Sequence, residues 1–251
     1  MTPQVPEYVL IFEPAVRPFV ASIALGLIWM GAARMEADAR TRYGTAAALS
    51  AALIAWLAAA QSLAAKNVYY AFSDGSAPIL LFGLLIPLIV AAVSLRLSPS
   101  IASLVSAIPL PWLVAAQIYR IAGGIFLVLW AGGHMPWQFA LPAGIGDVVT
   151  GAAAIVVAIL LARKAAGARR AAYAWSVFGI ADLVVAVTMG ALTSPGLPHL
   201  LAHDAPNVLI TSYPLVMVPT FAVPLALMLH GLVLWRLRQS ASAPAGRLVL
   251  A

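Results

Sequence analysis

The chain has 251 residues, of which 63% are hydrophobic and only 9% are charged, and its mean hydropathy is +1.00. Soluble domains are roughly half apolar and about one quarter charged, so this composition excludes an ordinary water-soluble fold. The absence of cysteine excludes disulfides, thiolate metal sites and cysteine nucleophiles. The formal charge of +6 indicates basic membrane flanks rather than nucleic-acid binding, because the basic residues gather between apolar segments.

Apolar segments recur along the whole chain. Seven of them are long enough, at about 1.5 Å per residue, to cross a hydrocarbon core of about 30 Å. The sequence therefore predicts an all-α integral membrane protein, folded as a single bundle of about seven transmembrane helices. Residues 239–251 are predicted to form a flexible cytoplasmic tail. The predicted spans are 16–33, 45–65, 78–97, 111–132, 138–162, 172–193 and 212–235.

Two shorter segments need a separate interpretation. The first sixteen residues contain no Lys or Arg, and Glu7 and Glu13 stand where a cleavable signal peptide carries positive charge. The first span is therefore expected to stay as a membrane anchor. Between the third and fourth spans, the apolar segment 98–110 is short and is closed by Pro109 and Pro111. It is expected to form an interfacial half-helix or a loop rather than another span.

The distribution of Lys and Arg predicts the orientation, because cytoplasmic loops carry most of the basic residues. With the N terminus outside and the C terminus in the cytoplasm, the outer segments carry only Arg17 and Lys66. Trp130 and Trp137 then bracket an outer hairpin, as expected for indole rings near lipid headgroups. We predict a multi-pass protein of the inner (plasma) membrane, surrounded by the lipid bilayer. The inner segments carry Arg34, Arg40, Arg42, Arg96, Arg163, Lys164, Arg169, Arg170, Arg236, Arg238 and Arg247.

The third and seventh spans share a proline pattern. Pro78 and Pro87 of the third span correspond to Pro214 and Pro224 of the seventh, and both spans end in a Leu-Arg pair. The pattern is compatible with a 3+1+3 repeat of helices, as in some small transporters, but similar composition explains it equally well. Pro87, Pro219 and Pro224 are predicted to kink their helices and to free backbone carbonyls.

Three charged residues lie inside predicted spans: Arg120, Asp147 and Asp182. A charge that faces lipid at the bilayer centre costs roughly 2.5 to 3.5 kcal/mol or more, so each is expected to face the bundle interior. Counted from Trp130 and Trp137, Arg120 and Asp147 lie about 15 Å deep, with Asp182 within side-chain reach. We therefore predict one polar site near the midplane. Small residues share the helical faces of these charges and favour close packing: Gln117, Arg120 and Gly124; Gly144, Asp147 and Gly151; Gly179, Asp182 and Ala186.

Further polar residues complete the predicted ligand-binding or ion-binding site. Gln117, Tyr119 and Thr150 could line a polar cavity beside the charges. His230 is expected about 7.5 Å inside the inner boundary, where it could relay a proton. The alternative is a neutral histidine that hydrogen-bonds a carbonyl freed by Pro224 or the hydroxyl of a Ser or Thr. For the charges themselves, the alternative is a permanent salt bridge that only fixes helix register.

A metal site is a separate hypothesis for the outer side. His199 and His203 are four residues apart, a spacing that could ligate a zinc ion, with Asp204 or His134 as a third ligand. Without the acid of a zinc-hydrolase helix, this set has no obvious general base. The alternative is an amphipathic outer loop that binds no metal.

Retinal and haem are not expected as cofactors. The two lysines, Lys66 and Lys164, lie at helix ends, so the last helix offers no amine for a retinal Schiff base. No second histidine in another span matches the depth of His230, so paired histidine ligands for haem are missing.

The leading hypothesis is a small-solute or proton- or ion-coupled transporter, or a ligand-binding membrane protein, that uses the buried arginine and acids. One alternative is a membrane-embedded enzyme or redox anchor subunit that uses His230 or the outer histidines, and another is a structural scaffold. A small solute, proton or cation is the expected partner, and nucleic acid is not. A homo-oligomer or a partner membrane subunit is also compatible with the sequence, which identifies no catalytic residue and no substrate.

Overall fold

The computed structural model describes residues 4–70, 79–196 and 198–242. Across these ranges the chain is helical and contains no strand. Seven helical segments are long and apolar enough to cross a membrane, which confirms the predicted all-α fold and is compatible with a multi-pass membrane protein. Pro78, at the start of the predicted third span, and the tail from residue 243 onward lie outside the described residues.

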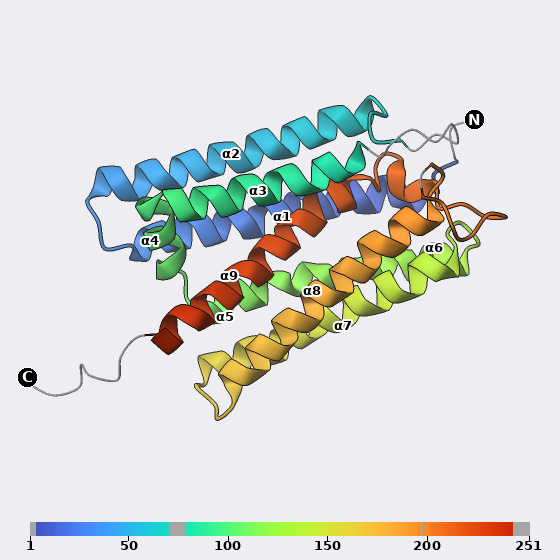
Figure 1. Cartoon of the computed structure of the whole chain (residues 1–251). Coiled ribbons are helices and arrows are strands. Elements are labelled where there is room, and N and C mark those ends of the chain that lie inside the picture. Colours follow the sequence, from blue (N-terminus) through green and yellow to red (C-terminus); the bar gives the residue numbers. More distant parts are fainter. Residues whose placement is uncertain (1–3, 71–78, 197, 243–251) are drawn as a thin grey trace, which may run out of the picture.

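The first four helices of the chain form one side of the bundle (Figure 1). Three long helices are joined there by a short one, α4, which packs against all three. This short helix is the half-helix expected in segment 98–110. Ser98 caps it, because its hydroxyl accepts a hydrogen bond from the Ile101 N–H at 3.3 Å. The helices are α1 (Glu7–Arg34), α2 (Ala39–Ala65), α3 (Leu80–Leu97) and α4 (Pro99–Ala107).

The fourth, fifth and sixth spans form the other side. The fourth span is not one regular helix, because a 3₁₀ segment, η1, interrupts it between two short α-helices. The fifth span packs against η1 and against the sixth span along most of its length. The elements are α5 (Leu110–Ala115), η1 (Ala116–Gly124), α6 (Ile125–Ala131), α7 (Trp137–Ala162) and α8 (Ala168–Thr193).

The last span lies between the two sides and contacts α3, α5 and α8. After a short turn, η2 (Leu209–Thr211), it begins as a π-helical segment, η3 (Val218–Ala222), and continues as α9 (Val223–Ser242). Pro224 cannot donate to the carbonyl of Thr220. That carbonyl instead accepts a hydrogen bond from the Trp56 indole at 3.2 Å. A neighbouring helix thus satisfies a carbonyl freed by proline, as predicted for this span.

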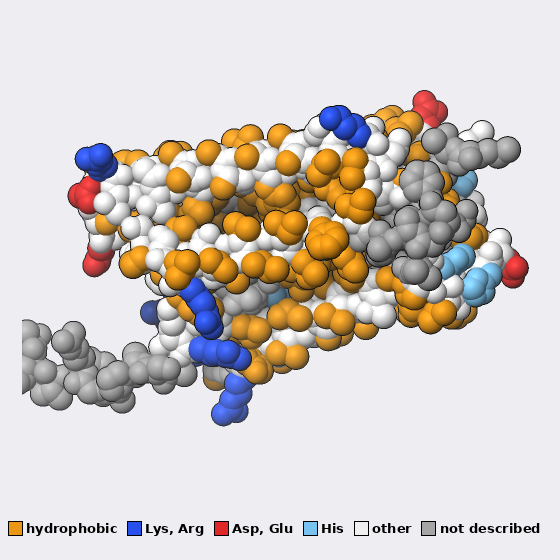
Figure 2. All heavy atoms as spheres, turned by 45° about the horizontal axis from the view of Figure 1, so that its top comes forward, with side chains coloured by type: hydrophobic (Ala, Val, Ile, Leu, Met, Phe, Trp, Pro, Cys, Tyr) orange, Lys and Arg blue, Asp and Glu red, His pale blue; other side chains and the backbone are white. Residues whose placement is uncertain are grey.

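The surface of the bundle suits a bilayer. Figure 2 shows hydrophobic side chains along its length, while Lys and Arg lie mainly toward the end at which α9 terminates. The histidine side chains on the surface of this face lie at the opposite end. The start of α1 and the end of α9 also lie at opposite ends of the bundle (Figure 1), as an odd number of crossings requires.

The first helix begins earlier than the predicted start at residue 16. It starts at Glu7 and therefore includes Glu13 and Arg17, although the sequence interpretation put Arg17 in an outer segment. The two side chains form a buried ion pair, in which Arg17 Nε donates to Glu13 Oε1 at 3.0 Å. The Arg17 guanidinium also lies 5.8 Å from the centre of the Tyr213 ring. Mutual neutralisation at i, i+4 lets the helix extend through both charges.

The second helix also starts earlier than its predicted start at residue 45. Asp38 caps it by accepting a hydrogen bond from the Thr41 N–H at 3.0 Å and one from the Thr41 hydroxyl at 2.6 Å. These hydrogen bonds stabilise the ionised carboxylate and hold the pKa of Asp38 below its usual value. The cap explains why the helix includes the charged residues 40 and 42.

Candidate functional site

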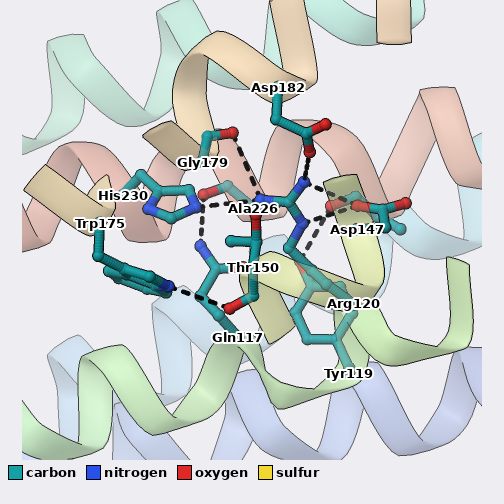
Figure 3. A network of polar contacts seen from close by, with 11 residues as sticks. Gln117, Tyr119, Arg120, Asp147, Thr150, Trp175, Gly179, Asp182, Ala226 and His230 are labelled. Atoms are coloured by element: carbon teal, nitrogen blue, oxygen red, sulfur yellow. Dashed lines mark hydrogen bonds and ion pairs between the residues drawn. The ribbon is translucent and has the colours of Figure 1, made fainter. Parts of the chain in front are cut away.

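Arg120 is the centre of a buried polar cluster, which also contains Asp147, Asp182 and His230 and is called the Arg120 cluster below (Figure 3). The guanidinium lies on η1 and is 3% exposed. Its Nε donates to Asp147 Oδ1 at 2.8 Å, and its Nη2 contacts the same oxygen at 2.7 Å and also Asp182 Oδ2. Its Nη1 donates to the Gly179 carbonyl at 3.3 Å and faces His230 Nε2 at 3.2 Å.

Protein atoms surround the Arg120 guanidinium. An arginine has five N–H groups, one on Nε and two on each Nη, and no acceptor. Four hydrogen bonds and one further ion-pair contact join it to two carboxylates, one carbonyl and one imidazole. All three nitrogens of the guanidinium are therefore engaged by the protein itself.

The 3₁₀ conformation of η1 determines what shares a face with Arg120. Three residues complete one turn of a 3₁₀-helix, so positions i, i+3 and i+6 are aligned. Gln117, Arg120 and Gly123 therefore lie on one face, whereas the predicted α-helical spacing pointed to Gly124. A Cβ on Gly123 would overlap the Asp147 carboxylate, and one on Gly124 would touch only Val148, at 3.3 Å.

Glycines at three positions make room for the cluster. A Cβ added to Gly123 would overlap Asp147, and one added to Gly146 would overlap the Asp182 carboxylate. The third glycine, Gly179, faces the His230 ring in the same way. Sequence reasoning put Gly179 on the correct face but missed the other two. The signals that could have found them are Gly123, three residues after Arg120, and Gly146, directly before Asp147.

The remaining predicted glycines pack helices against each other. A Cβ on Gly144 would meet Leu127 at 2.8 Å, and one on Gly151 would meet the backbone nitrogen of Ile121 at 2.7 Å. The α7 backbone thus approaches the fourth span closely on both sides of Asp147. This is the close helix packing that small residues permit.

His230 on α9 is fully buried beside Trp175, whose ring centre is 4.6 Å away. Because Arg120 can only donate, His230 Nε2 must accept, so the neutral ring carries its proton on Nδ1. That Nδ1 has no hydrogen-bond partner among the described residues. The predicted bond from His230 to a carbonyl freed by Pro224 is not present in this arrangement.

Three other buried polar atoms near the cluster lack partners among the described residues. They are Gln117 Oε1, Thr150 Oγ1 and Ser176 Oγ, and all three side chains are fully buried. Thr150 lies next to His230, because a Cβ on Gly179 would touch both. Buried polar atoms normally have a partner in the protein or in ordered water. The set is therefore suited to hydrogen-bond water or a polar ligand group.

Gln117 and Tyr119 connect the cluster to the last span. Gln117 Nε2 donates to the Ala226 carbonyl at 2.9 Å, and the Tyr119 hydroxyl donates to the Ala222 carbonyl at 3.0 Å. Both acceptors lie where η3 passes into α9. The irregular start of this span is thus hydrogen-bonded to the same segment that carries Arg120.

Asp147 lines two open cavities. One, of about 670 Å³, also contains Arg120, Tyr119 and the Glu13–Arg17 pair. The other, of about 830 Å³, lies between α3 and α8. Arg120 contacts only Oδ1 of Asp147, and among the described residues no hydrogen-bond donor reaches its Oδ2. Asp147 is therefore the member of the cluster best placed to meet a ligand.

The sequence interpretation missed the Glu13–Arg17 pair, because it started the first span at residue 16 and counted Arg17 with the outer segments. An acid and a base four residues apart within an apolar run, as in Glu-Pro-Ala-Val-Arg, is the signal that could have identified it. Its place on the first cavity makes it a neighbour of the Arg120 cluster.

The outer histidines lie away from the Arg120 cluster, in the connection between α8 and η2. The rings of His199 and His203 have centres 4.8 Å apart. Within the described ranges, no three His, Asp or Glu side chains converge as metal ligands. The metal site that includes Asp204 stays a prediction.

Comparison with known proteins adds a family but no activity. No curated protein and no solved structure matches this chain. A sequence model of a family described as a domain of unknown function, DUF8737, matches residues 77–238. That range covers every member of the Arg120 cluster and leaves out the Glu13–Arg17 pair. The chain belongs to this family, DUF8737.

Proposed function

We propose that this protein is a membrane carrier or ligand-binding protein that couples binding of a solute to a proton or cation held by the Arg120 cluster. The observation that supports it is the charge count. One guanidinium faces two buried carboxylates and a neutral imidazole. The cluster therefore holds one excess negative charge at a depth where charge is costly.

A proton or a cation removes that excess. An isolated buried charge is unfavourable, so groups in such sites bind a proton or pair with an ion. Asp147 Oδ2 and Asp182 Oδ1 are the carboxylate oxygens that Arg120 does not contact. A purely structural salt bridge needs one acid for one base. The second acid favours an exchangeable positive charge over the scaffold alternative.

The unpartnered polar atoms support a route for the proton. His230 Nδ1 lies on the far side of the ring from Arg120 and, like Thr150 Oγ1 and Ser176 Oγ, has no hydrogen-bond partner among the described residues. Hydrogen-bonded water between such groups can carry protons. Under this proposal His230 is a positioning and relay residue between the cluster and the end of the bundle at which α9 terminates.

The predicted orientation remains part of the proposal. The end of the bundle rich in Lys and Arg, where α9 terminates (Figure 2), favours a cytoplasmic C terminus and an outer N terminus. An inner (plasma) membrane location, transport and the 3+1+3 repeat are proposed on sequence grounds alone. A cysteine-accessibility assay tests the orientation, because the chain has no native cysteine and single cysteines at Lys66 and Lys164 would label from opposite sides.

Thermal unfolding of the purified protein between about pH 5 and about pH 9, in Na⁺, K⁺ or choline, tests the exchangeable charge. The folded cluster binds a positive charge that the unfolded chain does not bind near neutral pH. We therefore expect stability to fall as the pH rises, unless an added cation replaces the proton. Asp147→Asn and Asp182→Asn each remove the excess negative charge of the cluster, so either variant should show little change of stability with pH. Glu13→Gln should keep the pH dependence of the wild type. A pH profile that is unchanged in both Asp variants refutes the proposal.

Transport needs its own test in proteoliposomes. If the protein is a carrier, a pH gradient imposed across the membrane drives solute flux in the wild type. The Asp147→Asn variant should lose that flux although it inserts normally. Full flux in this variant contradicts a coupling role for Asp147.

A further inference from the structure

The cavity between α3 and α8 suggests what kind of molecule reaches Asp147. It lies between the first half of α3 and the second half of α8, with η3 beside it. Each of the two helices packs against α9, and neither has the other as a main packing partner.

The lining carries one charged side chain. Asp147 is the only charged residue among the described residues that line this cavity. The other polar side chains are the hydroxyls of Tyr69, Ser194 and Thr211, and those of Ser194 and Thr211 already donate to backbone carbonyls. The carboxylate of Asp147 is therefore the charged anchor of the cavity. The apolar walls include Leu81, Leu84, Phe139, Leu183, Ala186 and Val187.

The charge of the cluster selects the sign of the ligand. The guanidinium of Arg120 is already paired with protein groups, and a neutral molecule leaves the excess negative charge in place. The cavity shared with Glu13 and Arg17 carries both signs of charge and does not discriminate in this way. Of the two cavities that Asp147 lines, the α3–α8 cavity combines apolar walls with a single carboxylate among its described residues.

We infer that the ligand is an amphiphilic cation, with its positive centre on Asp147 Oδ2 and its apolar body between α3 and α8. This inference rests on the proposed function and specifies its substrate class. Neighbouring side chains of both helices face outward: Phe82 is 63% exposed and Val184 is 57% exposed. In a bilayer these faces meet lipid, where an amphiphilic cation concentrates. The apolar walls then bind the body of the ligand while the carboxylate fixes its charge.

Three probes separate the two requirements. Tetraphenylphosphonium has a cationic centre within an apolar body, tetraphenylborate has the same shape with a negative charge, and tetramethylammonium has the charge without the body. In a thermal-shift and equilibrium-binding assay on the purified full chain, we expect only tetraphenylphosphonium to bind saturably and to stabilise the fold. Asp147→Asn is expected to weaken this binding by about tenfold or more.

Cavity-filling variants separate failure of this inference from failure of the proposed function. Ala186→Phe and Gly190→Leu both reduce the space between α3 and α8, and Val185→Phe is a control on the exposed face of the same helix. We expect the first two to lose tetraphenylphosphonium binding but to keep the pH dependence of stability. The control keeps both properties, and Asp147→Asn loses both.

Other outcomes contradict the inference in distinguishable ways. Equal binding of tetraphenylborate, or binding that Asp147→Asn and both cavity-filling variants leave unchanged, overturns it as adsorption to detergent or lipid. Tetramethylammonium could also bind saturably and keep binding in the cavity-filling variants. That result overturns the inference, because the cation then reaches Asp147 without the apolar cavity. It leaves the proposed function intact. If the pH dependence of stability is lost only in variants outside the Arg120 cluster, the result overturns both this inference and the proposed function.

Discussion

Two buried groups of charged side chains line the same cavity, and they differ in how they are built. Glu13 and Arg17 are four residues apart on α1, so a single helix holds one acid against one base. In the Arg120 cluster, one base on η1 faces acids on α7 and α8 and a histidine on α9. The first pair is local and neutral. The second group joins four elements and is unbalanced, which suits a site whose charge must change.

Removal of the shared base is expected to have the largest effect. Arg120→Met leaves two buried carboxylates without their partner and should cost about 3 to 5 kcal/mol, the range for breaking a buried ion pair. The thermal unfolding midpoint in detergent measures this. Arg120→Met with Asp147→Asn and Asp182→Asn should recover much of the loss, because no uncompensated charge remains. Little recovery in that triple variant contradicts an electrostatic origin of the loss.

A smaller effect is expected when a methyl group is placed against the cluster. Gly146→Ala forces a Cβ onto the Asp182 carboxylate and should destabilise the fold by about 1 to 3 kcal/mol, as overpacking does. Gly26→Ala on α1 is the matched control, because no other heavy atom lies within 4 Å of the new Cβ. The control should be neutral or stabilising by up to about 1 kcal/mol. Equal stability of the two variants argues against the close approach of α7 and α8.

The local pair should matter less than the cluster. Arg17→Met leaves the buried Glu13 carboxylate without its hydrogen-bond donor and should cost about 1 to 2 kcal/mol. Adding Glu13→Gln should restore most of the stability, because the pair carries no excess charge and a neutral pair of similar shape replaces it. The double variant should also keep the pH dependence of the wild type. A changed pH profile would show that the two groups act as one site.

The smallest effect is expected outside the membrane, at the Asp38 cap. The hydrogen bonds from Thr41 lower the pKa of this carboxyl in the folded protein. Its contribution to stability is therefore present above the usual Asp value of about 4 and is lost as the pH falls through the lower, folded value. Asp38→Ala should remove this loss of stability at acidic pH. The pH dependence of stability near neutral pH, which the Arg120 cluster determines, should not change. Thermal unfolding at acidic pH measures it.

Much of the fold could be predicted, because a helix that crosses a bilayer must be long and apolar, and both properties can be read from the sequence. The residues that face inward were also identified, since Arg120, Asp147 and Asp182 cannot face lipid. It was harder to predict which residues share a helix face with these charges. Nine residues of η1 adopt a 3₁₀ conformation, which shifts the neighbouring glycine from 124 to 123. Nothing in the local sequence requires this, because packing against α7 and α9 decides it.

The start of α1 was mispredicted for a different reason. Single-residue hydropathy counts Glu13 and Arg17 as two penalties, whereas as a neutral pair they cost far less. The unpartnered atoms of Thr150, Ser176 and His230 could not be anticipated, because satisfaction of a hydrogen bond depends on tertiary neighbours.

The central claim is that the Arg120 cluster holds one exchangeable positive charge between two acids. Infrared difference spectroscopy of the purified protein can detect a buried protonated carboxyl group directly. We expect such a band in the ligand-free wild type, its loss in either Asp147→Asn or Asp182→Asn, and its persistence in Glu13→Gln. A wild-type spectrum without this band in the absence of any bound cation, or a band that survives both Asp substitutions, would contradict the account.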